Sequence, residues 1–227
     1  MKHLIYPIIT LFLLAACQQE ELPSGDGVGY LSLEDITVQT ANVVTTRAVD
    51  EDLYVKIDNN EPYSPGNVPT GRIDLQPGSH TLKVYNEAYE QYENWTNEDK
   101  GEAVYSLTTT FEVEAGKVNY FKAEVPMINF GVRLELPEGF DTAFPKNSFS
   151  VTGNRTVSLK DGETAYFPYS EDVSVSYKLS ATNTDGDPEN TDNGSSRDWG
   201  ANSTIQPGTV YVITYDYATK SLSLLAD

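Results

Sequence analysis

The stretch VSVSYKLSA, residues 173–181, carries the strongest structural signal in this 227-residue chain. Apolar or aromatic side chains stand at its odd positions, from Val173 to Ala181, and serine or lysine stands at the even ones. Successive side chains of a strand point to opposite faces, so this alternation predicts a strand with one buried and one solvated face. Strands of this kind are typical of antiparallel sheets in β-sandwiches.

The same period of two recurs along most of the chain. The 15 tyrosines and the scarcity of amphipathic helical patterns favour the same class, so we predict an all-β protein. Residues 183–200 have no period and are predicted to form a polar surface loop. The final two strands are expected to close a hairpin. Strands are predicted within residues 31–38, 53–57, 82–84, 105–113, 121–125, 130–136, 173–181, 210–217 and 222–225.

A short repeat, apolar-x-x-Gly-x-x-x-apolar, occurs four times. Glycine readily adopts the positive φ of tight turns, so each copy is interpreted as a turn that begins a new strand. Two copies lie on each side of Pro126, which favours a duplication over chance similarity of turns. We therefore predict two tandem antiparallel sandwiches, at residues 30–125 and 126–227. The copies are LQPGSHTL, VEAGKVNY, LKDGETAY and IQPGTVYV, with glycines at Gly78, Gly116, Gly162 and Gly208.

The N-terminus has the pattern of a secretory signal. A basic start is followed by the uncharged stretch 4–16, which is too short for a bilayer-spanning helix. The tetrapeptide LAAC, residues 14–17, resembles the bacterial lipobox, in which the cysteine is lipidated and becomes the first mature residue. Cys17 is the only cysteine in the chain, which favours lipidation over an ordinary signal peptide. We predict a signal peptide at residues 1–16 and an acidic tether at residues 17–29.

Composition excludes several classes of function. The formal charge of −19, which becomes −20 when Lys2 is removed with the signal, argues against a nucleic-acid partner. The mature chain keeps one histidine, His80, and it lacks the G-x-S-x-G and H-E-x-x-H motifs and a phosphate-binding glycine loop. We predict a non-enzymatic protein without catalytic residues or cofactor, although a pair of carboxylates for glycoside hydrolysis is not excluded by counting.

Two polar regions invite a binding interpretation. Asp185, Asp187 and Asp192 cluster oxygen ligands, but their spacing departs from the EF-hand pattern, so a solvated acidic loop is preferred and no metal site is predicted. Residues 85–105 are the most aromatic part of the chain. Tyr89, Tyr92 and Trp95 lie at helical spacing beside amides and carboxylates, and they are candidates for glycan contact. The competing interpretation, which we prefer, is that these rings pack onto a sandwich.

The chain resembles surface lipoproteins of the fimbrillin-like group of Bacteroidetes, and most of all a Bacteroides lipoprotein family described only as a domain of unknown function. The likeness is strongest over residues 28–136. It implies two transthyretin-like sandwiches anchored by lipid on the outer membrane, and a role in adhesion or in a surface pilus. Pilus subunits, or ligands on host or bacterial surfaces, would be the partners. The segments that carry it are LAACQQEE, YLSLEDITV, VTTRAVDEDLYVKI, IDLQPGSHTLKVYN and TTFEVEAGKVN.

The resemblance also suggests two sites of modification. Pilins of the group are cut after an arginine behind the first strand, which here places the cut between Arg47 and Ala48. Loss of that strand would open a groove that a neighbouring subunit fills by strand addition. The alternatives are that Arg47 is an ordinary loop residue and that the lipid anchor is retained, which the hairpin-like ending KSLSLLAD favours. Asp141-Thr142-Ala143 matches a short Bacteroidetes O-glycosylation signature, with Thr142 as acceptor.

Overall fold

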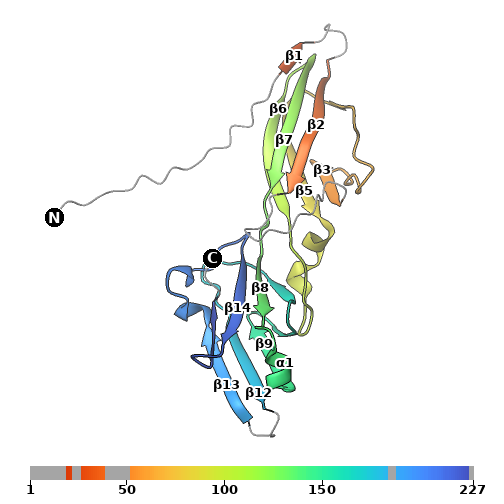
Figure 1. Cartoon of the computed structure of the whole chain (residues 1–227). Coiled ribbons are helices and arrows are strands. Elements are labelled where there is room, and N and C mark those ends of the chain that lie inside the picture. The colour runs from red at the N-terminus through yellow and green to blue at the C-terminus, as the bar shows by residue number, and fades with distance from the viewer. Residues whose placement is uncertain (1–18, 22–26, 39–51, 184–187, 225–227) are drawn as a thin grey trace, which may run out of the picture. The chain divides into compact units, whose positions relative to one another are not determined.

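The computed structural model describes residues 19–21, 27–38, 52–183 and 188–224 (Figure 1). Strands dominate this part of the chain, and the all-β class predicted from the alternation is confirmed. Backbone contacts divide the chain into two compact units. The first comprises the described residues up to Ile36 with Pro69–His80 and Phe111–Ala123, and the second comprises those within 37–68, 81–110 and 124–227. No helix among the described residues is long and apolar enough to cross a membrane.

The first unit is built on one four-stranded sheet. Its order is β1 (Gln19–Glu21), β7 (Lys117–Val125), β2 (Gly29–Val38) and β4 (Arg72–Leu75). The short strand β1 lies within the predicted tether and pairs antiparallel with β7. β2 is an interior strand, and its Leu31 is fully buried and faces Ile73 of β4 in the register. The first predicted strand is therefore a central element of this sheet rather than an appendage.

A three-stranded sheet consists of β3 (Leu53–Ile57), β5 (Gly78–Asn86) and β6 (Ser106–Val113). The burial of β3 alternates strictly, with Leu53, Val55 and Ile57 buried, as the sequence predicts. β3 runs antiparallel to β5, so that Val55 stands opposite Val84. β5 is followed directly by two short 3-10 helices, η1 (Glu87–Glu90) and η2 (Tyr92–Asn94).

Residues 126–224, here called the C-terminal sandwich, form two four-stranded sheets that bury one face each against a shared core. One sheet has the order β10 (Thr156–Leu159), β9 (Lys146–Thr152), β12 (Ser176–Thr182) and β13 (Pro188–Ser195). The other has the order β11 (Thr164–Phe167), β8 (Phe130–Glu135), β14 (Val210–Asp216) and β15 (Ser221–Leu224). The remaining elements are α1 (Phe140–Ala143), η3 (Ser196–Asp198) and η4 (Gly200–Asn202).

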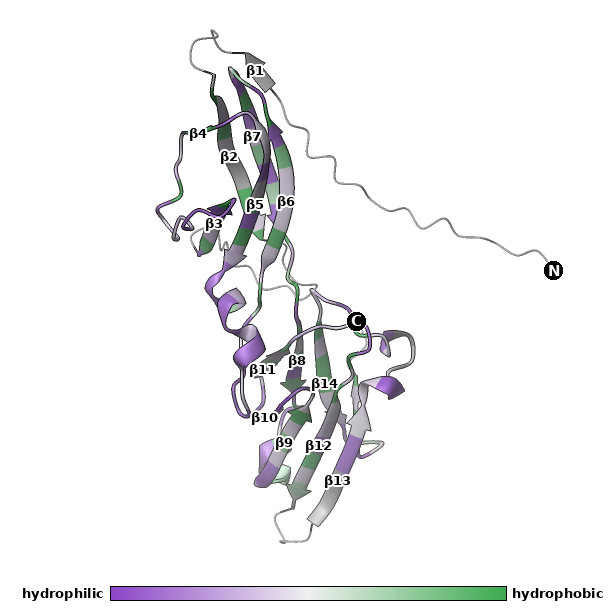
Figure 2. Ribbon diagram, turned by 180° about the vertical axis from the view of Figure 1, so that it is seen from behind, coloured by the Kyte–Doolittle hydropathy of each residue, from purple (hydrophilic) through white to green (hydrophobic). Residues whose placement is uncertain are grey.

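The alternating segment 173–181 lies at the centre of this sandwich. From Val175 to Ala181 every odd residue is buried and every even residue is exposed, and β12 lies between β9 and β13. Hydrophobic residues also alternate with polar ones along β9 and β12 in Figure 2. Burial of each large side chain, such as Leu179 or Phe149, stabilises the folded state by about 1.5–3 kcal/mol. The predicted domain bounds, 30–125 and 126–227, the transthyretin-like character and the tandem arrangement stay predictions.

One pairing in the C-terminal sandwich is parallel. β14 lies beside β8 in the parallel sense, with Val212 opposite Arg133, and it pairs antiparallel with β15 on its other side (Figure 1). β14 and β15 form the hairpin predicted from the sequence, and Leu222 of β15 is buried in the core. The described part of the C-terminus is therefore paired within its own sheet.

The polar loop predicted at residues 183–200 is wrong for its central part. Residues 188–195 form β13, which pairs with β12 over most of its length. β13 is the edge strand of its sheet, so backbone hydrogen bonds hold it without a hydrophobic face of its own. Gly194 lies directly on the ring of Tyr177, where any Cβ would overlap the aromatic atoms. Because side chains supply little of this pairing, the sequence shows no alternation there.

The four repeated glycines behave as predicted. Gly78, Gly116, Gly162 and Gly208 all have positive φ, from 73° to 136°. The strands β5, β7, β11 and β14 begin at these turns or within two residues of them. The Gly162 amide donates a 2.8 Å hydrogen bond to the carbonyl of Leu134. Each copy of the repeat is therefore a turn that starts a strand.

Gly162 allows a clean test of the turn. A Cβ at this position would meet nothing within 4 Å, so an alanine would suffer only from φ = 76°. We expect Gly162→Ala to lower the free energy of unfolding by about 1 kcal/mol, because side chains disfavour left-handed backbone by about that amount. Gly71→Ala is the matched control, since Gly71 is equally unobstructed and lacks a positive φ. Equal denaturation midpoints for the two variants would contradict the assignment.

Candidate functional site

The aromatic segment after β5 is held in short 3-10 helices rather than in the α-helix that its spacing suggests. In a 3-10 helix residues i and i+3 lie in line, so Tyr89, Tyr92 and Trp95 fall on one side. Ring centroids are 5.8 Å apart for Tyr89 and Tyr92 and 6.4 Å apart for Tyr92 and Trp95. All three side chains are partly buried. The spacing seen in the sequence therefore produces a continuous row of rings.

This row continues into the three-stranded sheet. Tyr85 of β5 lies 5.4 Å from Tyr89 and stacks at the same distance on Tyr54 of β3. The ammonium of Lys83 lies 3.9 Å from the centre of the Tyr89 ring, within the range of a cation–π contact. Burial, reinforced by Glu90, raises the pKa of Tyr85 to about 12. We call Tyr54, Tyr85, Tyr89, Tyr92 and Trp95 the aromatic ladder.

Arg155 joins the end of the ladder to the C-terminal sandwich. Its guanidinium carbon lies 5.2 Å from the centre of the Trp95 ring and 4.8 Å from that of Phe167, a core residue of β11. Nε donates to the carbonyl of Asp99 at 2.9 Å, and Nη2 donates to that of Tyr166 at 2.6 Å. Only 5% of the residue is exposed, and this desolvation lowers its pKa. A buried guanidinium with these partners fixes the segment in one position.

Residues 95–102, here called the docking segment, run along two sheet edges of the C-terminal sandwich. The Glu98 amide donates to the carbonyl of Thr156 in β10, and the Tyr166 amide of β11 donates to the carbonyl of Lys100. Lys100 also forms a 2.6 Å ion pair with Glu163. β10 and β11 are the outermost strands of their sheets on this side. The segment thus pairs backbone groups that an open edge would leave exposed.

The docking segment holds its own shape through a tight polar turn. One carboxylate oxygen of Asp99 accepts from the amide of Thr96 at 2.7 Å and from its hydroxyl at 3.0 Å. These bonds lower the pKa of Asp99, and the bond from Lys100 lowers that of Glu163. Gly101, at φ = 66°, packs flat on the Trp95 ring, where a Cβ would overlap it.

One buried and one half-buried asparagine side chain fix the residues that lead from the docking segment to β6. Asn129, fully buried, donates to the carbonyl of Glu102 and accepts from the amide of Val104. Asn86 makes the equivalent pair of bonds with Ala103 and Tyr105. Residues 102–105 are therefore held on both sides by side-chain amides.

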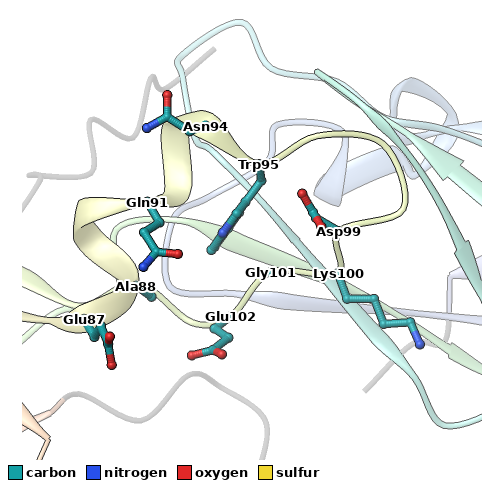
Figure 3. A pocket seen from close by; sticks show the side chains of 9 residues that line it. All are labelled: Glu87, Ala88, Gln91, Asn94, Trp95, Asp99, Lys100, Gly101 and Glu102. Atoms are coloured by element: carbon teal, nitrogen blue, oxygen red, sulfur yellow. The ribbon is translucent and has the colours of Figure 1, made fainter.

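Residues 87–94, which include the two 3-10 helices, and the docking segment line a pocket of about 600 Å³ (Figure 3). Figure 3 shows the indole of Trp95 between Gln91 and Gly101, whereas the side chain of Lys100 points away from it. Polar groups make up most of the rest of the wall. The pocket is lined by Glu87, Ala88, Gln91, Asn94, Trp95, Asp99, Lys100, Gly101 and Glu102.

The structure separates the predicted glycan residues. Trp95 lines the pocket, but Tyr89 and Tyr92 do not. All three pack against one another along the ladder. Arg155 was missed entirely, because a single arginine in a turn between two strands carries no periodic signal.

The other predicted sites have mixed outcomes. Thr142 is exposed on α1, so it stays a candidate for O-glycosylation. His80 stacks on Phe111 and its Nε2 lies 2.7 Å from the carbonyl of Gln76, which is a structural role. Cys17, Arg47 and Ala48 lie outside the described residues, as do Asp185 and Asp187 of the acidic loop. Asp192 accepts the Leu222 amide at 2.6 Å, so it links β13 to β15.

These observations define the class as an all-β protein of two compact units, with a polar pocket beside an aromatic ladder. The chain belongs to the family described as Domain of unknown function (DUF4493), whose model matches residues 27–224. The resemblance to a Bacteroides family of that description is thereby confirmed. No curated protein matches the chain in sequence.

Several solved structures are similar to the chain at low sequence identity. A candidate cell adhesion protein from Bacteroides uniformis is 11% identical with a TM-score of 0.53, and the match covers 89% of this chain and 99% of that one. A candidate adhesin from Bacteroides ovatus is 15% identical, with a TM-score of 0.44 and 90% and 94% coverage. A fimbrial assembly protein from Parabacteroides distasonis is 12% identical, with a TM-score of 0.34 and 92% and 100% coverage. The first of these establishes a shared fold over nearly the whole chain.

Arg155 can be tested by substitution. We expect Arg155→Ala to lower the free energy of unfolding by about 3 kcal/mol, because it removes two buried hydrogen bonds and leaves a void between two rings. Arg155→Lys should restore only part of the lost stability, since an ammonium cannot reproduce the planar set of N–H donors of a guanidinium. Arg197→Ala, at an exposed site, should change it by less than about 0.5 kcal/mol. Urea denaturation measures all three, and similar losses for Arg155 and Arg197 would refute the assignment.

Acid should release the docking segment. A carboxyl whose pKa is lowered by folding stabilises the fold above its unfolded pKa, and this is lost as the pH falls through the folded pKa. The ordinary values for Asp99 and Glu163 are 3.8 and 4.5, so docking should hold at neutral pH and weaken below about pH 4.5. Trp95 fluorescence would report it, because the second tryptophan, Trp199, is buried in the core. An unchanged acid transition in the Asp99→Asn, Glu163→Gln double variant would rule this out.

Proposed function

We propose that this chain is a non-enzymatic cell-surface protein with an adhesin-like or pilus-associated role. The observation that carries the proposal is the fold shared with the Bacteroides uniformis protein over 89% of this chain and 99% of that one. Membership in the family across residues 27–224 is consistent with it. The net charge of −19 suits a solvated extracellular surface.

Attachment to the outer membrane is part of the same proposal. The apolar stretch ending in Leu14-Ala15-Ala16-Cys17 is the pattern of a lipoprotein signal. A lipid on Cys17 would anchor the chain without any spanning segment. Thr142, exposed on α1, would be available to a glycosyltransferase in that location.

Retention of the anchor fits the structure better than polymerisation does. Cleavage between Arg47 and Ala48 would remove β1 and β2 from the four-stranded sheet of the first unit, leaving β7 and β4 without the strand between them. The buried Leu31 would be lost with them. At the other end, β15 already pairs with β14 and buries Leu222, so the described C-terminus offers no free strand for donation. We therefore favour a retained anchor, tip or adhesin component over a polymerising subunit.

Mass spectrometry of the protein from its native envelope, combined with whole-cell labelling, tests this proposal. We expect an acylated N-terminus at Cys17 and labelling of intact cells by antibody, with reduced attachment of cells that lack the gene. Cys17→Ser should move the protein out of the membrane fraction, and Arg47→Ala should leave mass and location unchanged. A chain that starts at Ala48 would instead support the polymerising pilin. Recovery only from the periplasm would contradict surface display.

A further inference from the structure

The pocket beside Trp95 is formed by a single segment that is fixed from behind. Its walls come from residues 87–95 and 99–102, and the second of these stretches is held by Arg155, Asn129 and the Lys100–Glu163 ion pair. A volume of about 600 Å³ lies within the usual range for small-molecule sites. Because these supports come from the protein's own contacts, binding there would cost little ordering of the chain.

The lining offers hydrogen bonds that the protein does not use itself. Within the described part of the chain, the side chains of Glu87, Gln91, Asn94 and Glu102 have no hydrogen-bond partner. The amides can donate and accept, and the carboxylates can accept. The set therefore suits a ligand that carries several hydroxyl groups, each able to donate and accept.

The charge of the pocket lining further restricts the class of ligand that the pocket can bind. Glu87, Asp99 and Glu102 contribute carboxylates, whereas the one ammonium, that of Lys100, is paired with Glu163 and points away from the pocket (Figure 3). The local field is negative, and so is the net charge of the chain. Phosphorylated, sulfated or carboxylated ligands would be repelled.

Trp95 supplies the flat apolar surface of the site. Its indole is partly buried, contacts Gly101 and meets the edge of Tyr92 at 78°. Support of this kind holds the ring in place, which is what stacking against the C–H face of a pyranose requires. Tyr89 and Tyr92 act behind it, as parts of the ladder.

We propose that this pocket binds a neutral glycan, with Trp95 stacking on a sugar ring and Gln91, Asn94 and Glu102 bonding its hydroxyls. The inference rests on the proposed surface role and gives it a ligand class. It differs from the sequence-based expectation in assigning contact to Trp95 and the pocket amides, and support to Tyr89 and Tyr92.

The test uses the full chain in detergent and a panel of neutral saccharides: galactose, mannose, fucose, N-acetylglucosamine and lactose. Saturation-transfer NMR would detect binding, and titration of Trp95 fluorescence would give the affinity. At least one of these sugars should bind, and Gln91→Ala and Glu102→Gln should each weaken it about tenfold. Both side chains are exposed and lack protein partners, so neither change should affect folding. Glu171→Gln, an exposed carboxylate outside the pocket, is the matched control.

Three outcomes would overturn the inference: no saccharide in the panel binds, binding is unaffected by Gln91→Ala and Glu102→Gln, or only a cationic probe such as polylysine binds. Trp95→Phe keeps an aromatic ring against Gly101 and should retain the fold, and it should weaken the saccharide signal in saturation-transfer NMR. Whole-cell labelling is measured separately. A chain that is displayed on the surface but binds no sugar would refute this inference alone, and a chain absent from the surface would refute the proposed function.

Discussion

The second unit depends on one buried guanidinium. Arg155 lies between the rings of Trp95 and Phe167 and donates to two carbonyls that belong to distant parts of the chain. A charge removed from water is costly unless its donors are satisfied, so this contact tolerates little displacement of either partner. The position of the docking segment follows from it, and with that position follow the covered edges of β10 and β11, the alignment of the ladder and the shape of the pocket.

That arrangement also explains why the aromatic residues are not simply a hydrophobic core. The C-terminal sandwich fills its own interior with residues such as Phe149, Leu179 and Ile213. The ladder runs outside that core, along a turn-rich segment that has few apolar neighbours of its own. Ring contacts and cation–π contacts with Lys83 and Arg155 hold it there. Trp95 thus has two roles: it supports the turn through its contact with Arg155, and it lines the pocket.

Whether an element could be predicted from the sequence depended on which interactions stabilise it. Where side chains supply it, as in β12 and β3, alternation located the strand and its buried face. Where the backbone has the positive φ that glycine adopts readily, the glycines of the repeat predicted the turns. β13 was not predicted, because a strand held at a sheet edge by backbone hydrogen bonds needs no alternation of apolar and polar side chains. Arg155 and Asn129 were not predicted because the contacts of Arg155 with Asp99 and of Asn129 with Val104 join residues 56 and 25 positions apart, which only the folded chain brings together.

The parallel pair β8 and β14 sets an order of events during synthesis. β8 is made about 80 residues before β14, and the sheet is complete only when β14 has paired with β8 and β15 has then added to β14. Until then β8 has an open edge, and the core lacks Ile213 and Tyr215. Contacts of such long sequence separation make folding slow, and the half-built sandwich is vulnerable to aggregation. A nascent chain would therefore stay dependent on chaperones until nearly its last residues had emerged, and ribosome stalling after β13 would leave a product that cannot mature.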